Sequence, residues 1–161
     1  MLDLLPDLCD LYPHHLTLAN PIFHSYGGKS CFHGETVTVK CFEDNSRIKE
    51  LVATNGKGKV MVVDGGGSQR KALLGDMLAE QALANGWEGL VIFGAIRDAG
   101  TQATLDIGIQ AIGVTPWKTE RKGVGEVGMV VSFAGLQIAT GDYIYCDLNG
   151  VALAKQPLAI P

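Results

Sequence analysis

The sequence predicts an α/β protein whose core is a mixed, barrel-like β-sheet with helices packed on one side. Two short apolar runs, at residues 60–63 and 90–93, flank a helical pattern, and this order is typical of a parallel strand pair joined by a crossover helix. After Asp98 the apolar runs are short and separated by turn residues, as in β-rich structure. The chain also contains 21 glycines among 161 residues, which favours many tight turns.

The first third of the chain predicts two helices and one strand. Residues 3–11 are expected to form a short helix that Pro13 stops. Residues 36–41 alternate between polar and apolar side chains, which indicates a half-buried strand. Residues 46–54 carry apolar side chains on one helical face, and Ser46 is the predicted N-cap.

The middle of the chain predicts the strand-helix-strand unit itself. The strand at 60–63 leads into a glycine-rich turn at 64–68, and a helix follows over 76–85, closed by Gly86. The second strand covers 90–93, and both strands are uniformly apolar, as expected for a sheet covered on both faces. Five further strands are predicted, at residues 110–115, 129–133, 137–140, 143–146 and 151–153.

The composition indicates one globular domain over residues 1–161. Hydrophobic residues make up 47% and charged residues 19% of the chain, which excludes a disordered protein. The formal net charge is −4, and no dense basic block indicates a nucleic-acid-binding face. The nearest basic cluster, Lys118, Arg121 and Lys122 around Glu120, is interpreted as a solvated loop. A small anion would therefore need a local cationic site.

The cysteines and the terminal segment predict a cytoplasmic protein. The four cysteines are Cys9, Cys31, Cys41 and Cys146. None forms a Cys-x-x-Cys pair, so we expect buried free thiols in a reducing compartment. No basic segment followed by an apolar run opens the chain, and no stretch approaches the roughly 18 apolar residues of a membrane span.

Polar residues gather at the carboxyl edge of the predicted parallel unit. The crossover helix starts where the first strand ends, and the second strand returns to the same edge of the sheet. We therefore expect residues 75–78 to meet Arg97 and Asp98, although 20 residues lie between Asp76 and Arg97. Ligands of open α/β sheets bind at this edge.

These residue types suit an anion and a metal ion. The free amides at the helix start attract anions, and Gly75 allows a ligand to approach the backbone. The Arg97 guanidinium matches a carboxylate in bidentate fashion. Asp98 is a hard oxygen ligand suited to Mg²⁺ or Mn²⁺, and Asp76 is suited to hold a metal-bound water.

Simpler interpretations stay open beside this one. Asp76 alone fits a plain N-cap, and Arg97 with Asp98 alone fits a surface ion pair. The run 64–68 lacks the Lys-Ser/Thr ending of a phosphate loop and is interpreted as a tight turn. The histidines have no metal-ligand spacing and are interpreted as surface or structural residues: His14, His15, His24 and His33.

Six segments along nearly the whole chain carry a family resemblance. They are residues 7–10, 23–28, 39–45, 62–68, 86–89 and 106–111. Through these segments the chain resembles the family named for the regulator of ribonuclease E activity A (RraA-like), which includes class II 4-hydroxy-4-methyl-2-oxoglutarate aldolases. The family's catalytic pattern is an Asp, twenty residues, then Arg-Asp, and it falls on Asp76, Arg97 and Asp98.

The resemblance implies a swivelling β/β/α-type fold and a homotrimer with active sites near the subunit interfaces. The substrate contacts that it implies are Gly75, Asp76, Met77, Leu78 and Arg97, and Asp98 is implied to bind a divalent ion partly through waters. The implied reaction forms a pyruvate enolate, either by retro-aldol cleavage of 4-hydroxy-4-methyl-2-oxoglutarate or by decarboxylation of oxaloacetate. A chelated metal ion stabilises such an enolate, so no Schiff-base lysine is needed.

Two departures from the family pattern favour decarboxylation over aldol cleavage. Family aldolases often carry an acid three residues after the Arg-Asp pair, where this chain has Thr101, and longer ones have a C-terminal extension, whereas this chain ends at Pro161. The alternative that the resemblance implies is a non-enzymatic trimer that docks on ribonuclease E and inhibits RNA processing. Asp98 argues for chemistry, because an inhibitor has no use for an acid there. A vestigial site in a structural trimer is a third interpretation.

Overall fold

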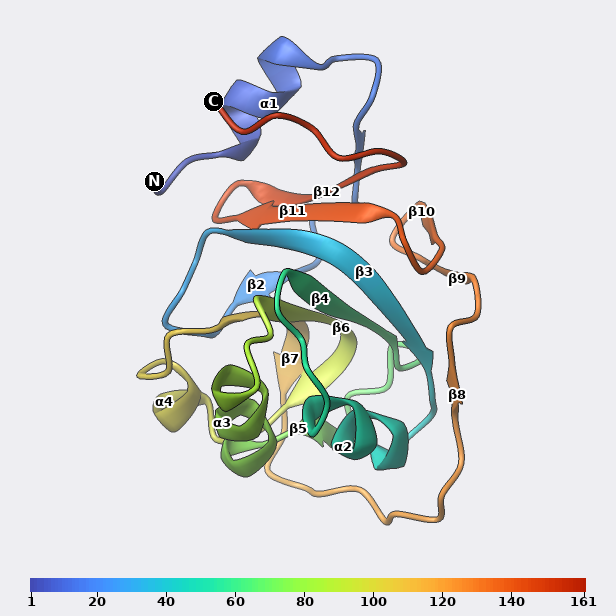
Figure 1. Ribbon diagram of the computed structural model, residues 1–161. Coiled ribbons are helices and arrows are strands. Elements are labelled where there is room, and N and C mark those ends of the chain that lie inside the picture. Colours follow the sequence, from blue (N-terminus) through green and yellow to red (C-terminus); the bar gives the residue numbers. More distant parts are fainter.

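A ten-stranded mixed sheet forms the centre of the protein, and the computed structural model describes all 161 residues (Figure 1). The strand order is β1-β12-β11-β3-β4-β6-β7-β2, with β5 paired to β6 and β8 paired to β3. The strands are β1 (Thr17–Leu18), β2 (His24–Ser25), β3 (Phe32–Lys40), β4 (Lys59–Asp64), β5 (Ala72–Leu74), β6 (Gly89–Ile96), β7 (Gly108–Val114), β8 (Glu126–Val127), β11 (Tyr143–Asp147) and β12 (Gly150–Ala154). A separate hairpin consists of β9 (Val131–Phe133) and β10 (Leu136–Ile138).

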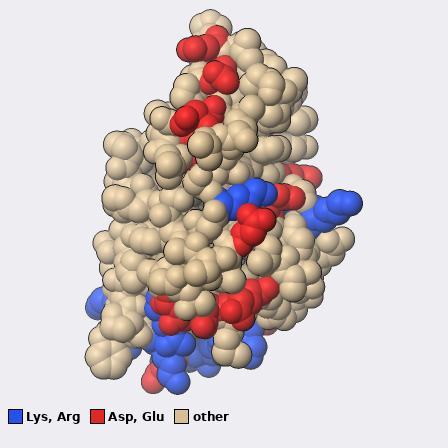
Figure 2. All heavy atoms as spheres, turned by 90° about the vertical axis from the view of Figure 1, so that its left-hand side faces the viewer, with Lys and Arg blue, Asp and Glu red and all other residues tan.

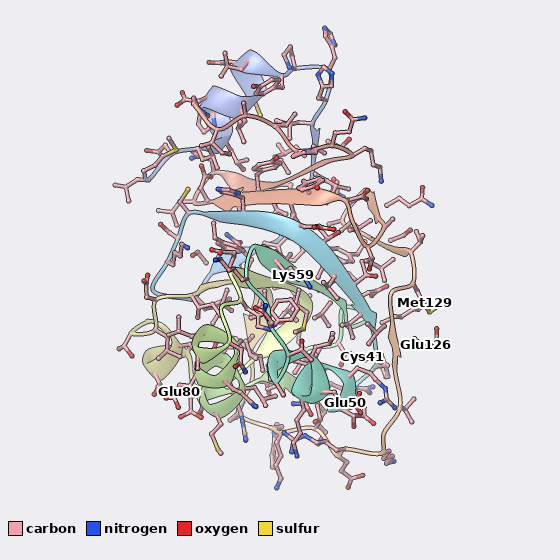
Figure 3. All side chains as sticks on the ribbon, in the orientation of Figure 1. Cys41, Glu50, Lys59, Glu80, Glu126 and Met129 are labelled. Atoms are coloured by element: carbon pink, nitrogen blue, oxygen red, sulfur yellow. The ribbon has the colours of Figure 1, made fainter.

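Four helices accompany the sheet. They are α1 (Leu5–Leu11), α2 (Ser46–Val52), α3 (Asp76–Ala84) and α4 (Ala99–Gln102). Glu50 on α2 and Glu80 on α3 lie on the solvent side of their helices (Figure 3). The longest helix, α3, has nine residues, and none of the four has the length and apolar run that crossing a membrane requires.

The sheet curls because its two edge strands are close neighbours in the chain. β1 and β2 stand at opposite ends of the strand order, yet only residues 19–23 join them. Such a short segment draws the two edges together. The Gln110 Nε2 on β7 also donates a hydrogen bond of 3.2 Å to the carbonyl of Asp147 at the end of β11. The predicted α/β class with a mixed, barrel-like core is confirmed.

The helices pack on the outer face of the curled sheet. Side chains of β11 alternate, since Ile144 and Cys146 belong to the inner cluster with the β9–β10 hairpin, whereas Tyr145 packs against α1. His33 on β3 is opposite Tyr145 and stacks on its ring at 5.7 Å. Val39, six residues further along β3, shares that face and belongs to the cluster beneath α2 and α3. The prediction of helices on one side is therefore confirmed.

The predicted parallel unit is present, but several element bounds differ. β4 and β6 pair in parallel with α3 between them, and β3 and β7 extend the parallel region on either side. β3 begins at Phe32, because its first half pairs with β11, a partner that periodicity does not reveal. The helix from Ser46 ends at Val52. Five elements were not predicted, because each has only two to four residues: β1, β2, β5, β8 and α4.

Two local predictions were wrong. Ser46 is the first residue of α2 and not its N-cap, which is Asn45. The reason is that the Asp44 carboxylate accepts hydrogen bonds from both the amide and the hydroxyl of Ser46, at 2.9 and 2.6 Å. All four cysteines are free, as predicted, but only Cys41 and Cys146 are buried. Cys31 is partly exposed, and Cys9 is exposed because Leu5 and Leu8 form the buried side of α1.

Two glycines, paired across β6 and β7, make room for one aromatic ring in the inner cluster. Gly89 and Gly108 are in register, and a Cβ at either position would lie within 2.4 Å of the buried Phe32 ring. We expect Gly108→Ala to lower the free energy of unfolding by about 1–3 kcal/mol through overpacking, measured by urea denaturation. Gly100→Ala is the matched control, because nothing lies within 4 Å of its Cβ position. Equal stability of the two variants would contradict the packing argument.

Candidate functional site

The start of α3 and the end of β6 meet at one rim of the sheet. β5 runs parallel to the last residues of β6, and the Leu74 carbonyl accepts a hydrogen bond of 2.9 Å from the amide of Arg97. A Cβ on Gly75 would lie 3.2 Å from the Arg97 Nε and 2.9 Å from the Asp98 Oδ2. The structure thus brings together the two segments that the parallel topology predicted would meet.

Asp98 caps α3 from a distant part of the chain. Its Oδ2 accepts a hydrogen bond of 3.0 Å from the amide of Asp76. Asp76 is the first residue of the helix, the N-cap position is Gly75, and no side chain of the local sequence caps the helix. The interpretation of Asp76 as a plain N-cap is therefore wrong. The next two amides, of Met77 and Leu78, have no acceptor within the helix and are available to a ligand.

A strained backbone turns the Asp98 carboxylate toward α3. Asp98 has φ 56° and ψ 41°, the left-handed conformation, which residues other than glycine seldom adopt. Such a residue costs about 1–3 kcal/mol and persists only where its surroundings hold it. Backbone strain of this kind concentrates at functional sites.

Gln102 holds the two segments together and was missed by the sequence analysis. It is fully buried, and its Nε2 donates to the carbonyls of Leu74 at 3.2 Å and Arg97 at 2.7 Å. Its own amide donates to the Asp98 carbonyl at 2.9 Å. Its Oε1 is the one buried side-chain oxygen without a partner. One side chain therefore fixes the end of β5 against the end of β6.

The guanidinium of Arg97 is available for a ligand. Its nearest carboxylate is Asp98, whose Oδ2 lies 3.9 Å from the Arg97 Nε, and its terminal nitrogens make no hydrogen bond or ion pair within the chain. The side chain is 40% exposed, so solvent or a ligand reaches it. A contact of 3.9 Å through Nε leaves the planar fork free to hold a carboxylate.

The rim opens into a cavity of about 800 Å³, a size typical of small-molecule sites. Five cationic side chains and two acidic ones line it: Lys49, Arg97, Lys118, Arg121 and Lys122 with Asp76 and Glu120. Figure 2 shows Lys and Arg side chains gathered at the lower end of the molecule. The loop 118–122 is therefore one wall of this cavity, and its charged side chains are exposed to solvent, in agreement with the interpretation as a solvated loop. A protein of net charge −4 thus carries a local cationic site.

Three consecutive residues at the start of α2 hold the 118–122 loop in place. Asn45 Oδ1 accepts hydrogen bonds from Thr119 at 2.8 Å and from the Arg121 Nε at 3.0 Å. Asp44 Oδ2 accepts from the amides of Lys122 at 2.8 Å and Val124 at 3.2 Å. The Ser46 hydroxyl accepts from a further amide of the loop, that of Gly123. No local pattern indicates these contacts, because 74 or more residues separate the partners.

Asp44 stays ionised to low pH inside this network. Burial raises the pKa of its carboxyl, but hydrogen bonds from Ser46 and from the amides of Lys122 and Val124 outweigh burial and hold the pKa at about 2. Because this value lies below the ordinary 3.8, the stabilisation is complete above about pH 4 and is lost as the pH falls through 2.

We expect Asp44→Asn to lower the free energy of unfolding by about 1–3 kcal/mol at neutral pH, since it removes one charged acceptor. Urea denaturation from pH 7 to pH 2 should show a smaller loss of stability on acidification in the variant than in the wild type. Asp10→Asn, at an exposed position of α1, is the control. A parallel pH dependence in Asp44→Asn and wild type would contradict the role of Asp44.

The acidic side chains at the rim fit a hydrated metal ion better than a fully protein-ligated one. The chain has no cluster of three or more His, Cys, Asp or Glu side chains that would hold a metal. Asp98 uses one carboxylate oxygen to cap α3, and its Oδ1 accepts no hydrogen bond. Mg²⁺ keeps several waters and takes one or two carboxylates together with substrate oxygens, which suits Asp98 with Asp76.

The glycine-rich turn 64–68 does not contribute phosphate-binding amides. The amide of Gly66 donates to the Asp64 carboxylate at 2.9 Å, and those of Gly65 and Gly67 donate to the Phe93 carbonyl. These amides are occupied within the fold, so the interpretation of this run as a tight turn is confirmed.

Comparison with known proteins agrees with the motif resemblance. The profile of the RraA-like family, described as Aldolase/RraA, matches residues 5–153. A relative from Marinomonas sp. (strain MWYL1), named "Putative 4-hydroxy-4-methyl-2-oxoglutarate aldolase", is 66% identical over 161 residues, and the alignment covers 100% of both chains.

Two solved structures share the fold over almost the whole chain. One is titled "Structure of the RNA-processing inhibitor RraA from Thermus thermophilis"; it has a TM-score of 0.93 at 37% identity and covers 99% of this chain and 96% of that chain. The other is titled as an S-adenosylmethionine: 2-dimethylmenaquinone methyltransferase from Geobacillus kaustophilus HTA426; it has a TM-score of 0.93 at 42% identity and covers 96% of each chain.

The names of these relatives describe three different activities on one fold, so function has to be argued from the site. The family itself is settled by the profile match over most of the chain and by the full-length identity. The chain belongs to the RraA-like family.

Proposed function

We propose that the protein is a divalent-metal-dependent lyase that releases pyruvate from small 2-oxo acids through an enolate. The observation that carries this proposal is the free Arg97 guanidinium beside the Asp98 carboxylate and the start of α3, at the rim of a cationic cavity. The full-length relatives named as aldolases support the same reaction class.

The residues at the rim have complementary roles in this proposal. Arg97 and the amides of Met77 and Leu78 bind the carboxylate and the 2-oxo oxygen of the substrate and orient the bond that breaks. Asp98, with Asp76 and waters, would hold Mg²⁺ or Mn²⁺. When bound, such an ion acts as a Lewis acid and stabilises negative charge on the enolate oxygen.

A direct assay tests the lyase proposal. Purified protein is mixed with oxaloacetate and Mn²⁺ or Mg²⁺, and pyruvate is followed through NADH consumption by lactate dehydrogenase. We expect a rate well above that of the metal ion alone, and we expect a chelator to return the rate to the metal-free blank. A rate equal to the metal-only blank, with both oxaloacetate and 4-hydroxy-4-methyl-2-oxoglutarate, would exclude the proposal.

Regulation of RNA processing is the second candidate, and it is favoured by the likeness to the structure titled as an RNA-processing inhibitor. In this proposal a homotrimer docks on ribonuclease E. Exposed apolar side chains near β8 offer area for contacts between subunits: Val124, Val127, Met129 and Val130. Light scattering tests the trimer mass, and titration against ribonuclease E tests the docking. No binding at micromolar concentration would exclude this role.

A further inference from the structure

The side chain of Arg121 is held in a fixed orientation in the 118–122 loop, which lines the same cavity as Arg97. Its Nε donates a hydrogen bond of 3.0 Å to the Oδ1 of Asn45, and Asn45 is buried, with its Nδ2 bonded to the Leu73 carbonyl at 3.1 Å. Thr119 donates to the same Oδ1 at 2.8 Å. The terminal nitrogens of Arg121 have no partner in the chain, so a guanidinium fork is anchored at one end and free at the other.

The cavity has more positive charge than is required to neutralise one bound carboxylate. Glu120 pairs with Lys122 at 3.7 Å, and Arg97 already serves the reacting end of the substrate under the proposed function. Lys49, Lys118 and Arg121 remain without an acidic partner. Among the three, only Arg121 is oriented by a buried side chain. A ligand with a second carboxylate would satisfy this surplus.

We propose that Arg121 binds the distal carboxylate of a 2-oxo dicarboxylate and thereby favours retro-aldol cleavage over decarboxylation. This inference rests on the proposed lyase function. Arg97 comes from the end of β6, and Arg121 comes from the loop between β7 and β8, so the two guanidinium groups line one cavity from separate elements. Each guanidinium has free terminal nitrogens, and a small diacid offers one carboxylate to each.

The preference follows from what happens to the distal carboxylate. In retro-aldol cleavage of 4-hydroxy-4-methyl-2-oxoglutarate, the 4-hydroxyl proton passes to a water held by Asp76, and the C3–C4 bond breaks. Its electron pair forms the pyruvate enolate, which takes the proton at C3, and C4 becomes the 2-oxo carbon of a second pyruvate that keeps the distal carboxylate. In oxaloacetate the C3–C4 bond also breaks into an enolate, but the distal carboxylate leaves as neutral CO₂. A cation on that carboxylate stabilises the ground state alone and opposes its loss.

Kinetics on both substrates test the preference. For Arg121→Met we expect the ratio of kcat/KM for 4-hydroxy-4-methyl-2-oxoglutarate to kcat/KM for oxaloacetate to fall by at least about tenfold. Arg121→Lys, which keeps the charge but loses the fork, should lie between Met and wild type. Arg70→Met is the matched control, because Arg70 is exposed, pairs with Glu43 and lies outside the cavity. An unchanged ratio in Arg121→Met overturns the proposal.

Binding of unreactive ligands separates this proposal from the lyase function. Calorimetry with Mg²⁺ uses 2-oxoglutarate, which has both carboxylates, and pyruvate, which has one. Arg121→Met should weaken 2-oxoglutarate binding by at least about tenfold and change pyruvate binding by less than about twofold. If the wild type converts neither substrate but Arg121→Met shows this binding pattern, the dicarboxylate site is present although the lyase activity is not. Equal weakening for both ligands, or no binding of 2-oxoglutarate by the wild type, overturns the proposal.

Discussion

Replacing Arg97 with Met is expected to lower kcat/KM for metal-dependent pyruvate release by about 10²–10³-fold, the loss typical of removing one donor to a developing oxyanion. The change removes the free guanidinium at the rim, whereas the backbone hydrogen bonds of residue 97 to Leu74 and Gln102 do not involve its side chain. The fold should therefore persist. The measurement is the coupled pyruvate assay with oxaloacetate at saturating Mn²⁺.

The lysine variant shows whether charge or geometry matters at this position. Arg97→Lys keeps the positive charge but cannot form two parallel hydrogen bonds to a carboxylate. We expect it to recover less than the full rate, with the larger part of its defect in KM. If Arg97→Met is as active as wild type and has the same melting temperature, the rim is not the reacting site.

Asp98→Asn is expected to reduce metal-dependent pyruvate release by at least about 10²-fold, down to the rate seen with chelator. Asparagine keeps an oxygen to accept the amide hydrogen of Asp76, and it tolerates the left-handed backbone of residue 98 better than most residues. The variant thus loses the negative charge for a metal ion while the cap of α3 is conserved. Titration of the rate with Mn²⁺ should show no saturation in the range that saturates the wild type.

Comparison of Asp98→Ala with Asp98→Asn separates the effect of the helix cap from the effect of the negative charge. It loses both, so its free energy of unfolding should fall by about 1 kcal/mol relative to Asp98→Asn. Thermal denaturation of the two variants measures this difference. A chelator-sensitive rate in Asp98→Asn equal to that of wild type would place the metal ion elsewhere.

The sequence predicted the site rim because a general rule of topology applies to it. The apolar runs of β4 and β6 and the helical pattern of α3 are local signals, and a parallel unit returns both carboxyl ends to one edge. This rule places the start of α3 and the end of β6 at the same edge, and β5, which the sequence did not predict, then sets residues 75–78 directly against Arg97. Gly75 as the cap position and Asp98 as the capping side chain could not be assigned locally, since the hydrogen bond joins residues 22 apart.

The second wall of the cavity could not be predicted from local patterns. Nothing in the run Lys118–Lys122 distinguishes a solvated basic loop from one that lines a cavity. Its position depends on Asn45 and Asp44, which lie before α2 and whose side chains serve a distant segment instead of their own helix. Gln102 was missed for the same reason, because its hydrogen bonds join two strand ends and follow no periodic pattern.

The pairing of the chain's two ends has a consequence for how the protein reaches its native state. β1 pairs with β12, and α1 packs on β11 and β12, so residues 4–18 find most of their partners among residues 143–158, which are synthesised much later. On the ribosome, Leu4, Leu5 and Leu8 lack most of their apolar partners until residues 143–158 have been made. Such long-range pairing slows folding relative to proteins with local contacts. The nascent chain therefore carries the unpaired apolar side of α1 until β11 and β12 have been made.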